Sequence, residues 1–206
     1  MTRSRVTAAE RNSAPRSIAE LARARLPPAF FAGDARAVAR SLIGCALVHR
    51  RRAGIIVETE AYLGPADLAS HARFGATART SVMFGPGGVS YVYLCYGIHR
   101  MFNIVTGRAG AAQAVLIRAI APYVGLPDDP AIGRGPGKVT RALALDLSHD
   151  RRELSRGALF VAPALVPPRI ARGPRIGVDY AGAWATRALR FWWHDHPAVS
   201  RRPAPP

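Results

Sequence analysis

The pattern of apolar and polar residues is clearest between positions 45 and 62. Residues 45–49 form an apolar run, residues 50–54 form a basic turn, and a second apolar run leads into Glu-Thr-Glu-Ala-Tyr62. Two short apolar runs on either side of a tight turn predict a β-hairpin. Because strand side chains alternate with a period of two, one face is predicted to carry Ile55, Val57, Thr59 and Ala61. We interpret that face as core and expect a functional site on the other, which carries Ile56, Glu58, Glu60 and Tyr62.

Glu58 and Glu60 conflict with the burial that the rest of this strand predicts. A carboxylate at a strand end, beside an aromatic ring and before the turn at Gly64-Pro65, is dehydrated on one side, which raises its pKa and suits a general base. The alternative is that both glutamates are structural and form ion pairs with arginines, because such pairs also lie at strand ends. The strand by itself does not decide between the two interpretations.

His71 is a second candidate for the site. It lies one helical turn after Asp67, so a short helix over residues 66–78 would turn both side chains toward the site. The alternative for His71 is an ordinary surface histidine.

A tyrosine-rich hairpin is predicted further along the chain. A turn at 85–88 leads into a strand over 89–96, and Gly97 permits a reversal into residues 99–105. Tyr96 then lies at the tip, where an aromatic side chain is suited to act as a wedge. A plain core strand is the alternative, but it leaves an aromatic residue beside the turn unexplained.

The remaining pattern predicts short elements. Helices are expected over 18–25, 35–42 and 139–147, the second of them capped by Asp34. A loop is expected over 122–132, and strands over 113–120, 159–164, 169–177 and 188–194. With no internal repeat or linker, we predict one domain over 18–200, a disordered basic arm over 1–17 and a disordered tail over 201–206.

Composition points to nucleic acid as the first partner to consider. The 206 residues include 29 basic and 13 acidic side chains, and only one basic residue is a lysine, so 28 are arginines and the formal charge is +16. Such an excess concentrates polyanions and favours forked contacts to phosphate. An acidic membrane surface is the weaker alternative. The length suits a single compact domain with a proper core.

The cysteines and the apolar runs indicate in which cellular compartment the protein is expected. Cys45 and Cys95 both lie in apolar runs, which favours reduced, buried thiols over a disulfide or a metal site. No apolar run approaches the length of a membrane span, and the first residues lack the apolar segment of a signal peptide. We therefore expect a cytoplasmic protein without a metal site or membrane contact. We also expect a bacterial protein associated with the nucleoid, a monomer without an obligate protein partner.

The only lysine, Lys138, closes a Gly-Arg-Gly-Pro-Gly segment that superficially resembles a phosphate loop. The segment lacks the preceding strand and the spacing of a nucleotide-binding P-loop. We therefore expect a loop and helix N-terminus, with Lys138, that contact a backbone phosphate of nucleic acid.

Taken together, these motifs resemble the alkyladenine (3-methyladenine) DNA glycosylase family over nearly all of residues 30–200. The matching segments are Glu-Thr-Glu-Ala-Tyr at 58–62, His71, the run from Met83 to Gly97, Asn103, Leu-Ile-Arg-Ala around Arg118, Gly-Pro-Gly-Lys to Lys138, and Arg-Ile-Gly at 175–177. The resemblance implies a single mixed α/β (α+β) domain with a curved antiparallel β-sheet, flanking helices and a protruding β-hairpin that enters the DNA minor groove. It also implies that no cofactor is needed.

The resemblance also implies roles for individual residues. The family's catalytic glutamate matches Glu60, and the arginine that positions the attacking water with it matches Arg118. The matches for binding the damaged base are Tyr62, His71, Tyr93 and Asn103. Tyr96 matches the tyrosine that intercalates into DNA, and the backbone carbonyl of Ile176 would complete the cage around the water.

The activity implied by the resemblance is excision of alkylated or deaminated purines from double-stranded DNA, in base excision repair. A noncatalytic nucleic-acid-binding module is the alternative, with arginines on phosphates and tyrosines stacked on bases. A lyase activity would need an amine nucleophile, and Lys138 is not on the glutamate strand, so we expect a monofunctional hydrolase.

Overall fold

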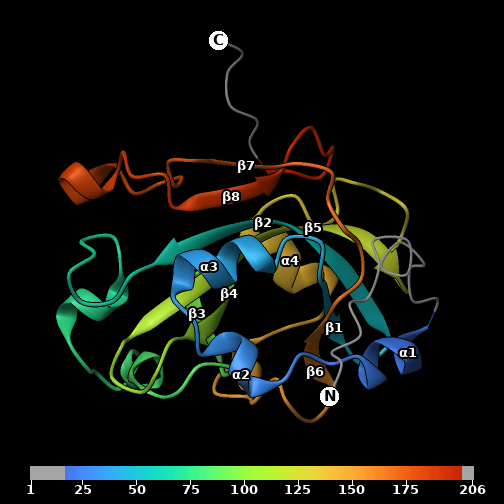
Figure 1. Cartoon of the computed structure of the whole chain (residues 1–206), viewed down its shortest axis with the longest axis horizontal. Helices are drawn as coiled ribbons and strands as arrows, with labels where there is room; N and C mark the ends of the chain where they lie inside the picture. The colour runs from blue at the N-terminus through green and yellow to red at the C-terminus, as the bar shows by residue number, and fades with distance from the viewer. Residues whose placement is uncertain (1–16, 201–206) are drawn as a thin grey trace, which may run out of the picture.

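In the computed structural model, which describes residues 17–200, an eight-stranded antiparallel sheet is built around β2 (Arg52–Tyr62). The strand order is β3-β4-β5-β2-β1-β6, and β8 pairs with both β2 and β7. The first part of β2 pairs with β1, whereas residues 58–60 pair with β8, so the sheet branches at β2 and curls (Figure 1). The other strands are β1 (Ala46–His49), β3 (Ser90–Cys95), β4 (His99–Thr106), β5 (Gln113–Val124), β6 (Leu159–Ala162), β7 (Ile170–Gly173) and β8 (Arg190–Trp193).

The helices are short, and two of them, α3 and α4, lie against the sheet (Figure 1). The α-helices are α1 (Ile18–Arg23), α2 (Pro28–Phe31), α3 (Ala35–Ser41) and α4 (Pro136–Ala142). The 3-10 helices are η1 (His71–Phe74), η2 (Ser81–Phe84), η3 (Leu147–His149) and η4 (Asp179–Trp184). The Asp34 side chain accepts a hydrogen bond from the Arg36 N–H, which confirms the predicted cap.

Several predicted boundaries were wrong, most clearly those of α4, of β5 and of β7, which covers Ile170–Gly173 rather than 169–177. Helix α4 begins at Pro136 rather than at 139, because proline is favoured in the first turn of a helix, and it ends before Ala144, which has a φ of 52°. Strand β5 continues to Val124, into the segment predicted to be a loop, because its last residues pair with the start of β2 at Ala53.

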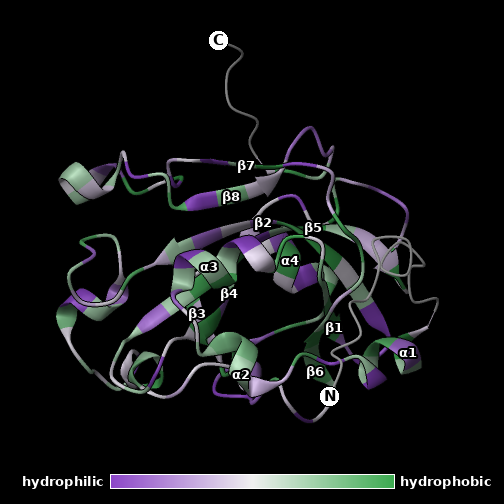
Figure 2. Cartoon of the chain, in the orientation of Figure 1, coloured by the Kyte–Doolittle hydropathy of each residue, from purple (hydrophilic) through white to green (hydrophobic). Residues whose placement is uncertain are grey.

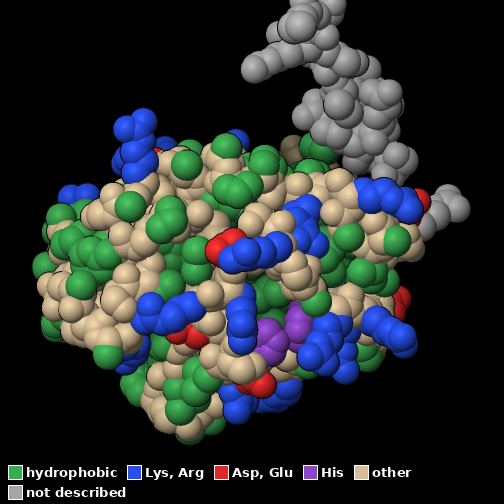
Figure 3. Space-filling model, turned by 90° about the horizontal axis from the view of Figure 1, so that it is seen from below, with side chains coloured by type: hydrophobic (Ala, Val, Ile, Leu, Met, Phe, Trp, Pro, Cys, Tyr) green, Lys and Arg blue, Asp and Glu red, His purple; other side chains and the backbone are tan. Residues whose placement is uncertain are grey.

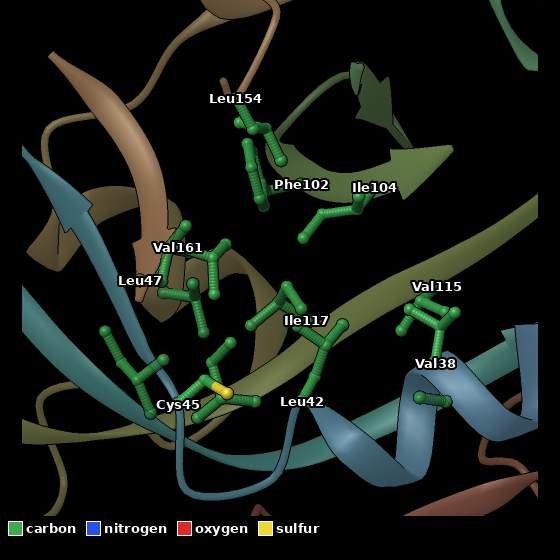
Figure 4. Packing of buried hydrophobic residues seen from close by; sticks show 14 of the residues in the cluster. Val38, Leu42, Cys45, Leu47, Phe102, Ile104, Val115, Ile117, Leu154 and Val161 are labelled. Carbon is green, nitrogen blue, oxygen red and sulfur yellow. The ribbon is translucent and has the colours of Figure 1, made fainter. Parts of the chain in front are cut away.

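The larger hydrophobic core fills the space between the sheet and α3. Figure 4 shows Val38 of α3 beside Val115 of β5, and Leu42, the residue after α3, beside Ile117 of β5. A second cluster contains Ala46, Val48, Phe160 and Trp192 with Leu21 of α1, so the strands of this region are covered on both faces. Figure 2 accordingly shows hydrophobic residues concentrated along β1, β4 and β6.

The predicted alternation along β2 fails in its middle. Ile56 and Ala61, expected on opposite faces, share the larger core cluster, whereas Ile55 and Val57 belong to the second cluster. The register with β5 shifts on both sides of Glu58, and such a bulge adds a residue to one strand and reverses the faces beyond it. All residues from 53 to 61 are buried, so both faces of β2 are core over most of its length, and only its end at Glu60 and Tyr62 borders a cavity.

The predicted fold class, a mixed α/β fold with a curved antiparallel sheet, flanking helices and a β3–β4 hairpin, is confirmed. The predicted arm and tail lie outside the described residues, except for Ser17, whose side chain caps α1. None of the helices within residues 17–200 is long and apolar enough to cross a membrane.

Glu58 is a structural carboxylate. It has no exposed surface, its Oε1 accepts a hydrogen bond from Arg190 Nε at 2.6 Å, and its Oε2 accepts one from the Ser200 backbone N–H at 2.7 Å. Arg118 Nε lies 3.4 Å from the same Oε1. These contacts join β2, β5 and β8, so the ion-pair interpretation holds for this one of the two glutamates.

We predict that Glu58→Gln destabilises the fold, because a neutral amide leaves the Arg190 charge buried without its carboxylate. Breaking a buried pair from one side costs about 3–5 kcal/mol. Chemical denaturation measures the loss. Glu153→Gln, which removes an exposed pair with Arg156, is the control and should change the free energy of unfolding by less than about 1 kcal/mol. A Glu58→Gln protein as stable as that control would contradict the structural role.

Candidate active site

Strand register brings the candidate residues to one place. Tyr91, Asn103, Leu116 and Glu60 are successive Cα partners on β3, β4, β5 and β2. Residues paired in this way point their side chains to the same face. A cavity of about 460 Å³ lies there. Its lining includes eight of the nine residues predicted for the site: Glu60, Tyr62, His71, Tyr93, Tyr96, Asn103, Arg118 and Ile176.

Glu60 forms a fully buried part of the cavity wall. Its Oε1 accepts a hydrogen bond from the Ile176 backbone N–H at 2.9 Å, and its Oε2 accepts one from the Tyr62 hydroxyl at 3.0 Å. Arg118 Nη1 lies 3.6 Å from Oε1. Burial raises the pKa of Glu60, and the Arg118 charge, the Ile176 N–H and the Tyr62 hydroxyl offset only part of that effect. The group is therefore a stronger base than an exposed carboxylate.

Arg118 is held between the two glutamates. Its Nε faces Glu58 at 3.4 Å and its Nη1 faces Glu60 at 3.6 Å, so one guanidinium links the structural and the candidate catalytic carboxylate. Its side chain is only 14% exposed, and it lines the cavity. The guanidinium of Arg118 is thus fixed beside the Glu60 carboxylate, where a nucleophile activated by Glu60 would bind.

The aromatic wall of the cavity is uncharged at neutral pH. His71 Nδ1 lies 2.9 Å from the Tyr91 hydroxyl, and the His71 and Tyr93 rings meet edge to face with centroids 4.6 Å apart. Burial, together with the charges of Arg79 and Arg73, lowers the pKa of His71 to about 4. A positively charged ligand would therefore meet no imidazolium there.

Asn103 has one end of its amide engaged. Its Nδ2 donates to the Tyr91 carbonyl at 3.1 Å and more weakly to the Met101 carbonyl at 3.5 Å. Asn103 is buried and lines the cavity. Among the described residues Oδ1 has no partner, so this oxygen is the atom available to a ligand.

Arg175 is a site residue that sequence reasoning did not identify. Its Nη1 and Nη2 donate to the Asp67 carboxylate at 2.6 and 2.8 Å, and its guanidinium lies 4.7 Å from the centre of the Tyr62 ring. All three side chains help to hold the segment that carries Ile176. The expectation that Asp67 faces the site from a helix with His71 was wrong, because Asp67 precedes η1 and its carboxylate is paired with Arg175.

The tip of the β3–β4 hairpin is exposed and apolar. Tyr96 is 91% exposed and Ile98 is 72% exposed, as predicted for the tip. Tyr96 adopts a φ of 50°, a left-handed conformation that is uncommon for a residue other than glycine. Because Tyr96 also lines the cavity, the hairpin tip and the Glu60 site form one continuous surface.

Lys138 and Ile176 make contacts that the sequence did not predict. Lys138 does not line the cavity; it lies within α4, not in the loop before it, and its Nζ donates to the Ala131 carbonyl at 3.2 Å. At Ile176 the group that contacts Glu60 is the N–H, and the role of its carbonyl remains a prediction.

Comparison with known proteins defines the class. The family model described as Methylpurine-DNA glycosylase (MPG) matches residues 29–197. This match and the buried Glu60 beside an aromatic cavity identify a DNA glycosylase, a hydrolase of DNA repair. The chain belongs to the methylpurine-DNA glycosylase family.

Curated relatives agree with the family match over nearly the whole domain. A protein of Myxococcus xanthus is 50% identical over 186 residues, covering 87% of this chain and 95% of its own length. One from Anaeromyxobacter sp. (strain Fw109-5) is 51% identical, covering 87% of this chain and 94% of its own. One from Legionella pneumophila (strain Corby) is 42% identical, covering 86% and 98%. All three are named "Putative 3-methyladenine DNA glycosylase".

We predict that Glu60→Gln, unlike Glu58→Gln, does not lower stability at pH 8. Burial dominates the raised pKa of Glu60, so the ionised group opposes folding. This unfavourable contribution is fully present above the folded pKa, shrinks as pH falls below it and is lost at the unfolded value of about 4.5. The variant should therefore melt at the same or a higher temperature than the wild type at pH 8. The difference should shrink toward pH 4.5. Thermal melts across this range measure it, and a large loss at pH 8 would show that ion pairing outweighs burial.

Proposed function

We propose that this protein flips alkylated or deaminated purines, of the 3-methyladenine, 7-methylguanine and hypoxanthine type, out of duplex DNA. It then hydrolyses the N-glycosidic bond of the flipped nucleotide and leaves an abasic site. The observation that carries the proposal is the buried Glu60, whose pKa is raised by burial, in the wall of an aromatic cavity that continues to an exposed hairpin tip. The family membership supports the same reaction class.

Base recognition follows from the walls of the cavity. Tyr62, Tyr93 and His71 line it, and the faces of such aromatic rings interact best with electron-poor, positively charged rings such as alkylated purines. The neutral His71 adds no repulsion to a cationic base. Asn103 faces the base edge from β4, and its fixed amide crowds a purine that carries an exocyclic 2-amino group. Normal guanine is thereby disfavoured, and 7-methylguanine, which carries the same 2-amino group, should be excised more slowly than 3-methyladenine or hypoxanthine.

The chemical step assigns Glu60 as general base. The ionised carboxylate takes a proton from a water molecule, the water oxygen forms a bond to the anomeric carbon, and the bond from that carbon to the purine nitrogen breaks with its electron pair going to the leaving base. The transition state resembles an oxocarbenium ion, which the Glu60 charge also stabilises. Arg118 holds the carboxylate. Because Glu60 has no exposed surface, the water takes the place of the Tyr62 hydroxyl at Oε2.

The reaction ends with hydrolysis. A lyase step requires an amine that attacks the sugar, and the only lysine of the chain, Lys138, lies in α4 and does not line the cavity. We therefore assign a monofunctional enzyme. A module that binds nucleic acid without catalysis is the second candidate, since the chain carries a formal charge of +16.

We predict that Glu60→Gln binds lesion-containing DNA but loses base release by about 100-fold or more, the range of general-base contributions. In the wild type, single-turnover release should fall as pH drops through the raised pKa of Glu60, so the midpoint should lie above the ordinary carboxylate value of 4.5. Release of free base from methylated duplex is the measurement. Turnover by Glu60→Gln near the wild-type rate would remove Glu60 as the base, and no release by the wild type would favour the binding module.

We predict that Tyr96→Ser weakens excision from duplex DNA more than from single strands. A tyrosine at an exposed tip can fill the gap left by a flipped base, and stacking of this kind is worth about 1–3 kcal/mol, or roughly 5- to 150-fold. A single strand has no partner to open, so the loss there should be much smaller. Single-turnover excision of one lesion in matched duplex and single-stranded oligonucleotides tests this, and equal losses would rule out the wedge.

A further inference from the structure

A second and larger cavity lies at the other end of β2. Its volume is about 950 Å³, and it is bordered by the β1–β2 turn, the end of α4 and residues 146–159. None of its lining residues lines the Glu60 cavity. Arg52, in its wall, begins β2, and eight residues of strand (60 − 52) separate it from Glu60, or about 26 Å. The two cavities are therefore separate sites.

The lining of this cavity is strongly basic. It contains two acidic residues, Asp146 and Glu153, and six arginines: Arg50, Arg51, Arg52, Arg151, Arg152 and Arg156. With its histidines counted as neutral, the lining has a formal charge of +4, from six arginines and two acidic residues. Figure 3 shows such a face, with histidine side chains in a hollow and Lys and Arg side chains around it. Like charges that converge on a hollow repel one another, so their convergence favours an anionic ligand.

The floor of the cavity is a fixed pair of histidines. His49 Nδ1 lies 2.7 Å from the Leu143 carbonyl and therefore carries the hydrogen, because a carbonyl oxygen only accepts. The Nε2 atoms of His49 and His149 are 3.1 Å apart, and His149 Nδ1 lies 2.8 Å from Asp146 Oδ1. Each ring is thus oriented by a second partner. The floor is polar and rigid, which suits a polar ligand that enters the hollow.

Backbone strain at the rim of this cavity also favours a binding function. Arg50 has a φ of 55° and Arg151 a φ of 60°, both in the left-handed region. Arg50 and Arg51 are the two residues of the β1–β2 hairpin turn. A left-handed first residue in such a turn favours glycine, but this chain has Arg50 at that position. The side chains of Arg50 and Arg51 are exposed and form no hydrogen bond or ion pair with other residues of the 17–200 segment. Folding does not account for two arginines in this turn, and strained residues of this kind cluster at functional sites.

We propose that this cavity binds a compact phosphomonoester, either the 5′-phosphate of a free nucleotide or the terminal phosphate of a DNA strand. Arginine forks match phosphate geometry, and a monoester carries nearly two negative charges. The cavity volume is that of a small-molecule site. The convex backbone of an intact duplex carries single charges and cannot reach the histidine floor, so an end or a free nucleotide is the better fit.

The test uses a variant that keeps the turn. Arg50→Gly with Arg51→Ser supplies the residues that the turn favours, so the melting temperature should be unchanged or higher. Arg40→Ser with Arg172→Ser, two exposed arginines that do not line the cavity, removes the same charge and is the control. Excision of 3-methyladenine should be unchanged in the turn variant, because its residues lie far from Glu60.

Calorimetric titration of the full chain with adenosine 5′-monophosphate and with adenosine gives the first comparison. The monophosphate should bind and adenosine should not, and the turn variant should bind the monophosphate roughly ten- to hundredfold more weakly, while the control variant changes little. A parallel titration compares a short single-stranded oligonucleotide with and without a 5′-phosphate. Preference for the phosphorylated strand alone assigns the strand end as the source, and binding of the monophosphate assigns the nucleotide.

Three results would overturn the proposal. One is equal binding of phosphorylated and unphosphorylated probes, or none. Another is an equal loss of phosphate affinity in the turn and control variants, which would reflect net charge only. The third is binding of Zn²⁺, abolished by His49→Gln, without any binding of the phosphorylated probes, since this would assign the histidine pair to a metal ion.

Discussion

The structure depends on the ion pairs that Glu58, a carboxylate buried in an inner strand, forms with arginines of the neighbouring strands. Glu58 and Glu60 have no exposed surface, and Arg118 of β5 lies between them. A buried charge without a partner is strongly unfavourable, so the strands that carry the arginines must lie where they do. Arg190 meets this requirement from β8, at the point where the sheet branches. The Glu58 carboxylate therefore contacts both the arginine of β8 at this branch and the arginine that lies beside Glu60.

The two glutamates differ in how completely their oxygens are used. Glu58 receives a guanidinium and a backbone N–H from β8 and the segment after it, which leaves no side open. Glu60 receives one backbone N–H and one phenol, and it lies in the wall of a cavity. A phenol is displaced more readily than an arginine pair. The same residue type is thus structural at one position and suited to catalysis two residues later.

Arg175 shows how a distant pair supports the site. Its bidentate pair with Asp67 is fully buried and brings the segment of residues 175–176 against the end of β2. The Ile176 N–H then reaches Glu60, and the guanidinium lies over the Tyr62 ring. A charge-assisted pair of this kind adds orientation as well as stability. Residues that line the cavity are therefore held by residues that do not line it.

The sequence by itself determined the β1–β2 hairpin, the Asp34 cap, the exposed tip at Tyr96 and the family, because these follow from local period, turn chemistry and short motifs. It did not determine which face of β2 each residue occupies, because a bulge at Glu58 resets the alternation and a bulge has no reliable local signal. Only the tertiary structure decided that Asp67 pairs with Arg175 and Glu58 with Arg190, since sequence spacing carries no trace of contacts more than a hundred residues apart. The basic cavity at the other end of β2 also arises only when the chain has folded, because its arginines come from two distant segments.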